Sequence, residues 1–99
     1  MAGYKTRPGV VLTEIAGEYV LVAAKALSGV CPYVTLINES SAFLWRKLEQ
    51  GANLEQLQAA VSAEYEVEDP AAVQSAIRDF IRHMNELNYL LTDETEERK

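Results

Sequence analysis

Three short segments rich in β-branched, leucine and tyrosine residues come before any helix-forming segment in this chain of 99 residues. They cover residues 10–15, 18–23 and 33–37, and Ala16-Gly17 joins the first two as the turn of a β-hairpin. A sheet of this size is unstable in water unless other elements cover its apolar face. The later helices must therefore pack on it, which predicts an α+β fold.

Three helix starts follow these strands. Asn38 and Asn53 can each cap a helix with the side-chain oxygen, and Gln56 completes a capping box with Asn53. Asp69-Pro70 marks the third start, because aspartate caps well and proline has no amide to leave unpaired in the first turn. Gly51 ends the first helix. Three strands followed by three helices is the order of a winged-helix-like domain.

The third helix is the longest and extends from Pro70 to about Leu87. Asn88 can adopt the left-handed backbone conformation that ends helices, and residues 89–92 can return as a short extended segment. The apolar stripe of this helix is wider than contact with one sheet requires, so we expect it to serve two surfaces. The stripe consists of Val73, Ala76, Ile77, Phe80, Ile81, Met84 and Leu87.

Composition excludes several classes of partner. The net charge of −6 opposes approach to phosphate backbones and anionic lipid, so we expect neither nucleic acid nor membrane as a partner. No apolar run approaches the ~20 residues that span a bilayer, and the N-terminus lacks the apolar stretch of a secretory signal. Cys31 is the only cysteine, which excludes an internal disulfide and suits a reducing compartment. These features predict a cytoplasmic protein.

The usual signatures of catalysis are also missing. There is no glycine-rich phosphate loop, no Gly-x-Ser-x-Gly turn and no His-Glu-x-x-His pair. His83 is the only histidine and is expected to be solvated, while Cys31 has no histidine at a suggestive spacing. Trp45 lies on a helical stripe with Leu48 and is expected in the core. The sequence therefore predicts a protein that is not an enzyme and has no metal or cofactor.

An ordered set of residues carries a family resemblance. It comprises the run Leu36 to Trp45, then Leu48, Gly51, Leu54, Leu57, Tyr65 to Val67, Asp79-Phe80 and Leu87 to Leu91. In this order and over roughly residues 8–91, the chain resembles the PqqD family. Family members usually have glycine where this chain has Asn88, and asparagine is the commonest substitute in that backbone conformation.

The resemblance implies a peptide-recognition domain formed by residues 1–99, with residues 1–9 as an N-terminal arm and residues 93–99 as a charged tail. Such domains bind the leader of a ribosomally synthesised precursor peptide and present it to a modifying enzyme, often a radical-SAM protein. The leader adds as a strand to the edge of the third strand and packs against the third helix.

Transferred to this chain, the resemblance places the receiving edge at Val34, Thr35, Leu36 and Ile37. The groove wall comes from the third helix, with the candidates Val73, Ile77, Phe80, Ile81 and Met84. The candidates for pairing with acidic leader residues are Arg78 and Arg82, with an ordinary solvent-exposed face as the alternative.

Two other functions remain open from sequence alone. A winged-helix DNA-binding regulator has the same element order, and the third helix carries Arg78, Arg82 and His83. Asp79 and Glu86 interrupt that basic surface. An oligomerisation or adaptor domain is the other alternative, in which the free edge and the apolar stripe meet a second copy in a homodimer.

Overall fold

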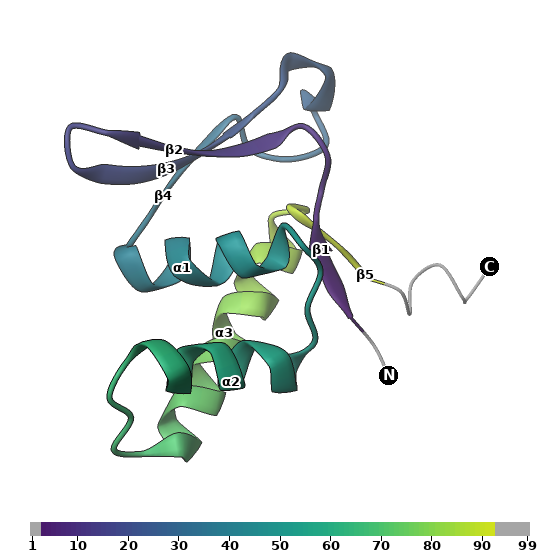
Figure 1. Cartoon of the computed structure of the whole chain (residues 1–99). Helices are drawn as coiled ribbons and strands as arrows, with labels where there is room; N and C mark the ends of the chain where they lie inside the picture. The colour runs from purple at the N-terminus through teal and green to yellow at the C-terminus, as the bar shows by residue number, and fades with distance from the viewer. Residues whose placement is uncertain (1–2, 93–99) are drawn as a thin grey trace.

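The computed structural model describes residues 3–92 and has the predicted α+β architecture (Figure 1). A three-stranded antiparallel sheet is followed by three helices, and the strands lie in the order β2-β3-β4. The strands are β2 (Val10–Ile15), β3 (Glu18–Ala23) and β4 (Val34–Ile37), and the helices are α1 (Glu39–Leu48), α2 (Leu54–Glu64) and α3 (Pro70–Glu86). A short 3-10 turn, Lys25–Leu27, lies between β3 and β4.

The hairpin between β2 and β3 turns at Ala16-Gly17, as predicted. Both residues have positive φ, 52° and 83°, which is the combination found in a type I′ turn. The twist of such a turn matches the twist of the strands it joins. Glycine adopts this conformation freely, whereas alanine at the first position carries a Cβ atom that disfavours it.

Replacing Ala16 with asparagine is therefore expected to stabilise the protein by about 0.5 to 1 kcal/mol, since Asn-Gly is the preferred pair for this turn. Urea unfolding of Ala16→Asn beside the original protein measures the change. Gly17→Ala is the control in the opposite direction: it places a Cβ atom at a position with positive φ and is expected to destabilise the protein. An unchanged or lower midpoint for Ala16→Asn would contradict the expected stabilisation.

The local signals at the helix ends are confirmed. The Asn38 side chain accepts from the Ser41 amide at 2.8 Å, and Asn53 and Gln56 form both hydrogen bonds of the capping box. At the start of α3, Asp69 accepts from the amides of Ala71 and Ala72. Gly51 and Asn88 follow α1 and α3 with φ of 89° and 65°. Helix boundaries here follow from interactions within a few residues.

A two-stranded ribbon extends the predicted fold. β1 (Tyr4–Thr6) pairs antiparallel with β5 (Leu90–Thr92), so part of the expected N-terminal arm is a strand that the sequence did not predict. The extended return after α3 is confirmed. Tyr4 also exchanges two backbone hydrogen bonds with Ala52, at 2.8 and 3.0 Å, which ties the ribbon to the loop after α1. The charged tail, residues 93–99, lies outside the described residues.

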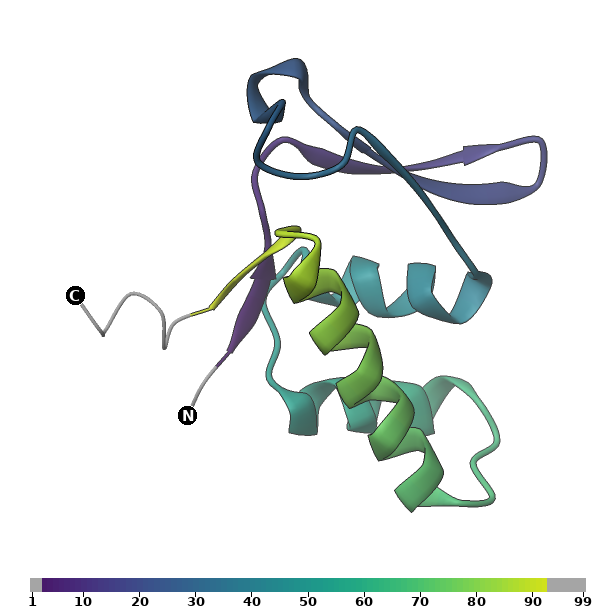
Figure 2. The same ribbon diagram turned by 180° about the vertical axis from the view of Figure 1, so that it is seen from behind.

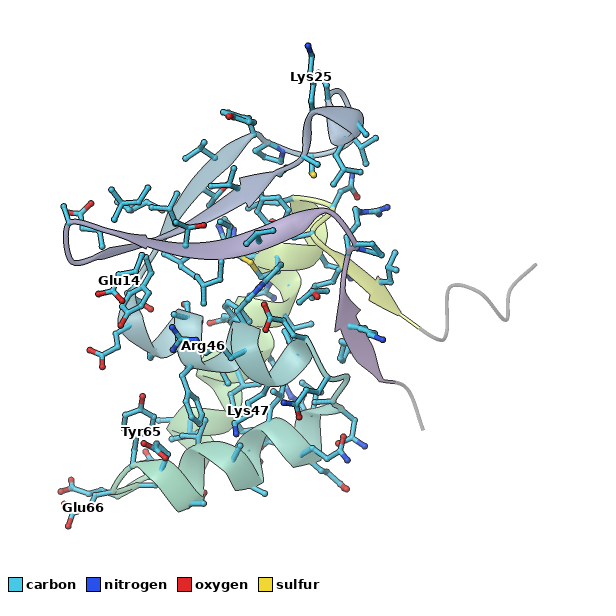
Figure 3. All side chains as sticks on the ribbon, turned by 45° about the horizontal axis from the view of Figure 1, so that its top comes forward. Glu14, Lys25, Arg46, Lys47, Tyr65 and Glu66 are labelled. Carbon is cyan, nitrogen blue, oxygen red and sulfur yellow. The ribbon has the colours of Figure 1, made fainter. Side chains whose placement is uncertain are left out.

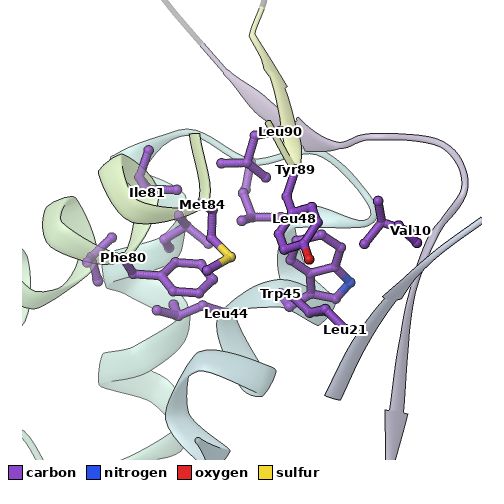
Figure 4. Packing of buried hydrophobic residues seen from close by; sticks show 14 residues of the cluster. Val10, Leu21, Leu44, Trp45, Leu48, Phe80, Ile81, Met84, Tyr89 and Leu90 are labelled. Atoms are coloured by element: carbon purple, nitrogen blue, oxygen red, sulfur yellow. The ribbon is translucent and has the colours of Figure 1, made fainter. Parts of the chain in front are cut away.

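One apolar core lies between the sheet and the helices (Figure 4). The largest fully buried side chains are Trp45, Tyr89, Leu21, Leu48, Leu57 and Met84. Trp45 is fully buried as predicted and packs edge-to-face on Tyr89, with ring centroids 6.1 Å apart. Charged side chains such as Lys25 and Glu66 point away from the body of the protein (Figure 3). The core thus joins β3 to both α1 and the segment after α3.

Candidate functional site

β4 forms an edge of the sheet. Within residues 3–92 it pairs only with β3, in a register that places Val34 opposite Val22 and Ile37 opposite Tyr19. The Ala23 amide donates to the Tyr33 carbonyl at 2.8 Å, so the backbone groups of Tyr33 face β3. Because this orientation alternates along an antiparallel strand, the backbone groups of Val34 and Leu36 face away from the sheet.

The side chains of β4 also alternate. Val34 and Leu36 are 52% and 64% exposed on the outer face of the sheet. Thr35 and Ile37 are half-buried on the face toward the helices, where Ile37 packs against the core. Unpaired amides and carbonyls at Val34 and Leu36 can therefore receive another strand without disturbing the pairing with β3.

A groove of about 600 Å³ lies beside this edge, between β4 and α3, and we refer to it as the β4–α3 groove. Leu36 and Ile37 line it on the β4 side. The start of α1 and the end of α2 also contribute to it. Figure 2, which shows the molecule from behind, has α3 in front of α2. Its lining residues are Leu36, Ile37, Asn38, Ser40, Ser41, Phe43, Leu44, Val61, Tyr65, Val73, Ala76, Ile77, Asp79, Phe80, His83 and Met84.

Four of the five α3 residues proposed above as candidates for the groove wall do line this groove: Val73, Ile77, Phe80 and Met84. Ile77, Phe80 and Met84 are at the same time buried in the core, with exposures of 3%, 8% and 1%. The same side chains of the wide apolar stripe on α3 therefore both line the groove and pack in the core. Substituting these three residues changes stability as well as the groove.

The remaining nominated residues of α3 lie elsewhere. Ile81, Arg78 and Arg82 line a second depression of about 410 Å³, shared with Tyr4 and Leu54 rather than with β4. Arg82 forms an ion pair with Asp79 on the surface of the helix. Neither arginine lines the β4–α3 groove, so a peptide bound in that groove would not contact these two side chains within it.

Several groove residues were not nominated from the sequence. Phe43 and Tyr65 meet edge-to-face with ring centroids 5.4 Å apart, and both line the groove. Phe43 lies off the apolar stripe of α1, and an aromatic residue outside a core stripe is a usable signal for a binding surface. His83 is exposed as expected, but it also lines the groove.

The character of the groove favours an apolar guest. Its walls are mostly aliphatic and aromatic, and Asp79 and His83 contribute the charged or titratable groups of α3 along its rim. No group of three or more metal-ligating side chains occurs within the part of the chain that the structure describes. No helix within residues 3–92 is both long enough and apolar enough to cross a membrane. An extended segment with alternate apolar side chains fits an edge and groove of this kind.

A family comparison covers most of the elements described above. The model of the PqqD family, coenzyme PQQ synthesis protein D, matches residues 18–90. The chain belongs to the PqqD family. That match includes β3, β4 and all three helices of this PqqD-family protein, and hence every element that lines the groove.

Two solved structures resemble this PqqD-family protein. One is TbiB1 in complex with the TbiA(beta) leader peptide, which is 28% identical with a TM-score of 0.69, and the alignment covers 87% of this chain and 93% of that one. The other is lasso peptide synthetase B1 complexed with the leader peptide, at 17% identity and the same TM-score, with 89% and 96% covered. The second likeness concerns the fold alone. No curated protein matches the chain.

Proposed function

We propose that this protein is a peptide-binding recognition domain that takes the leader of a ribosomally synthesised precursor peptide as an added strand on β4. The proposal rests on one observation: the free backbone edge of β4 and the apolar groove lie side by side. Val34 and Leu36 turn free backbone groups outward, and the apolar β4–α3 groove begins beside them at Leu36 and Ile37. Backbone hydrogen bonds would supply affinity, and alternate side chains in the groove would supply specificity.

The relationship to TbiB1 supports this proposal, because that protein has been captured with a leader peptide and shares this fold over most of both chains. We propose that residues 1–99 act as one such binding unit, without catalysis of its own. The bound leader would be presented to a modifying enzyme, for which a radical-SAM protein is our candidate. Pull-down of the enzyme encoded beside this gene, with and without the leader, tests that partner.

The charges on α3 do not favour the alternative function, DNA recognition. Arg82 is engaged by Asp79, and Glu86 lies beside Arg78 and Arg82 in the second depression. A helix that reads the major groove needs a continuous basic surface. Tight, salt-sensitive binding of duplex DNA in a gel-shift experiment would favour the regulator instead.

An amide-resolved NMR titration tests the proposed function. The probes are a synthetic leader peptide of a precursor encoded beside this gene and, as a second probe, the TbiA(beta) leader. We expect the largest shifts at Val34 and Leu36, whose amides gain partners, and at Ala76 and His83 along the groove. Shifts confined to the β1–β5 ribbon or to the second depression would contradict strand addition to β4.

A further inference from the structure

Two consecutive residues after α3 hold the segment that leads into β4. The Asn88 side chain donates from Nδ2 to the carbonyl of Val30 at 2.8 Å. The Tyr89 hydroxyl donates to the carbonyl of Pro32 at 3.0 Å and lies 2.6 Å from the hydroxyl of Thr35 in β4. Because the single phenolic hydrogen points to Pro32, Thr35 is the donor in the second contact.

Tyr89 is itself fixed to α3. Its amide donates to the carbonyl of Met84 at 3.0 Å, and Met84 lines the groove. Its ring is fully buried and packs on Trp45. Burial also raises the pKa of the Tyr89 hydroxyl above its usual value, although the hydrogen bond from Thr35 acts in the opposite direction. The hydroxyl therefore stays protonated, and remains a donor, throughout the neutral range.

β4 needs such an attachment because of the groove. It is a four-residue edge strand with β3 as its neighbour in the sheet. Toward α3, the β4–α3 groove lies between the two elements, and Ile37 at the end of β4 is the strand residue that packs against the core, so packing holds β4 mainly at that end. The hydrogen bonds of Tyr89 join α3 to β4 across this gap at one end.

We propose that Tyr89 is a positioning residue for the strand-addition site, in which its hydroxyl sets the place of β4 relative to α3 and hence the width of the groove. This inference rests on the proposed function. It gives Tyr89 a role beyond filling the core, because the ring packs on Trp45 with or without the hydroxyl, whereas only the hydroxyl reaches Pro32 and Thr35.

The test compares Tyr89→Phe, which keeps the ring, with Thr35→Val, which keeps the shape of the β4 side chain. Because Tyr89→Phe removes both hydrogen bonds that hold β4 in place, we expect it to lower leader affinity about tenfold. Thr35→Val is expected to cost less, and adding it to Tyr89→Phe should cost little more, because both changes break the same contact. The two leader peptides of the titration are the probes, and calorimetry measures the affinity.

Amide hydrogen exchange separates positioning from general stabilisation. In Tyr89→Phe we expect faster exchange at Thr35 and Ile37, with the amides of α2 unchanged. Leu57→Val is the control, because Leu57 is fully buried in α2 and does not line the groove. Leu57→Val should lower the urea midpoint of unfolding and leave leader affinity unchanged.

The possible outcomes bear on different claims. If the original protein binds a leader and Tyr89→Phe binds it equally well with unchanged exchange in β4, Tyr89 has no positioning role. If the original protein binds neither leader and its β4 amides do not respond, the proposed function fails. In that event the exchange rates of Thr35 and Ile37 in Tyr89→Phe still decide whether the hydroxyl fixes β4.

Discussion

Leu36→Pro is expected to weaken leader binding strongly while the protein stays folded. The Leu36 amide points away from β3, so the sheet loses no hydrogen bond when proline replaces it, and proline is tolerated at such edge positions. Thr35, which precedes it, is already extended, as a residue before proline must be. A guest strand loses a donor and meets the proline ring at the edge. The expected loss is about 2 kcal/mol, or roughly thirtyfold in affinity.

Glu14→Pro is the matched control for this variant. Glu14 is exposed on β2, the opposite edge of the same sheet, and lies next to Ile15, which pairs with Glu18 across the hairpin turn. By the same alternation its amide points away from β3. We expect Glu14→Pro to bind the leader as the original protein does. Equal weakening by both prolines would attribute the effect to the sheet as a whole and contradict a site at β4.

Ile77→Asp is expected to unfold the protein. Ile77 is 3% exposed and belongs to the core cluster as well as to the groove wall. Burying a carboxylate there without a partner costs several kcal/mol beyond the lost packing, a large share of the roughly 5 to 15 kcal/mol that stabilises a domain. Circular dichroism with thermal melting should show no cooperative transition at neutral pH. A folded Ile77→Asp variant would mean that this position is open to solvent.

A neighbouring residue separates binding from folding. Ala76 lines the groove but is exposed, so a larger side chain there can occupy the groove without entering the core. Ala76→Phe is expected to keep the melting temperature close to that of the original protein and to weaken leader binding about tenfold or more by occupying the space for a guest side chain. Unchanged affinity in this variant would place the guest side chains elsewhere.

The elements that sequence reasoning predicted well are those specified by neighbours in the chain. The caps at Asn38, Asn53 and Asp69 and the left-handed residue Asn88 each depend on contacts within one helix turn. β1 was not predicted, because the three residues Tyr-Lys-Thr are too short a run for their alternation to indicate a strand. It becomes a strand only because residues 90–92 return beside it from the far end of the chain.

The site was only partly predictable, for two physical reasons. The family resemblance places the receiving edge at Val34 to Ile37, but which two of these residues turn their backbone groups outward depends on the register with β3. On α3, periodicity identifies an apolar stripe but not its neighbours. Ile81 therefore could not be told apart from Ile77, although one lies by Tyr4 and Leu54 and the other lines the groove.

The β1–β5 ribbon has a practical consequence for handling the protein. Tyr4 ties it to Ala52, just beyond the C-terminal end of α1, whereas β4 leads into the N-terminal end of the same helix. The ten residues of α1 span about 15 Å, which keeps the two places apart. A fluorophore, a surface tether or a fused enzyme introduced before Tyr4 or after Thr92, which pair at the end of the ribbon away from Tyr89, would thus leave the proposed strand-addition site on β4 unobstructed.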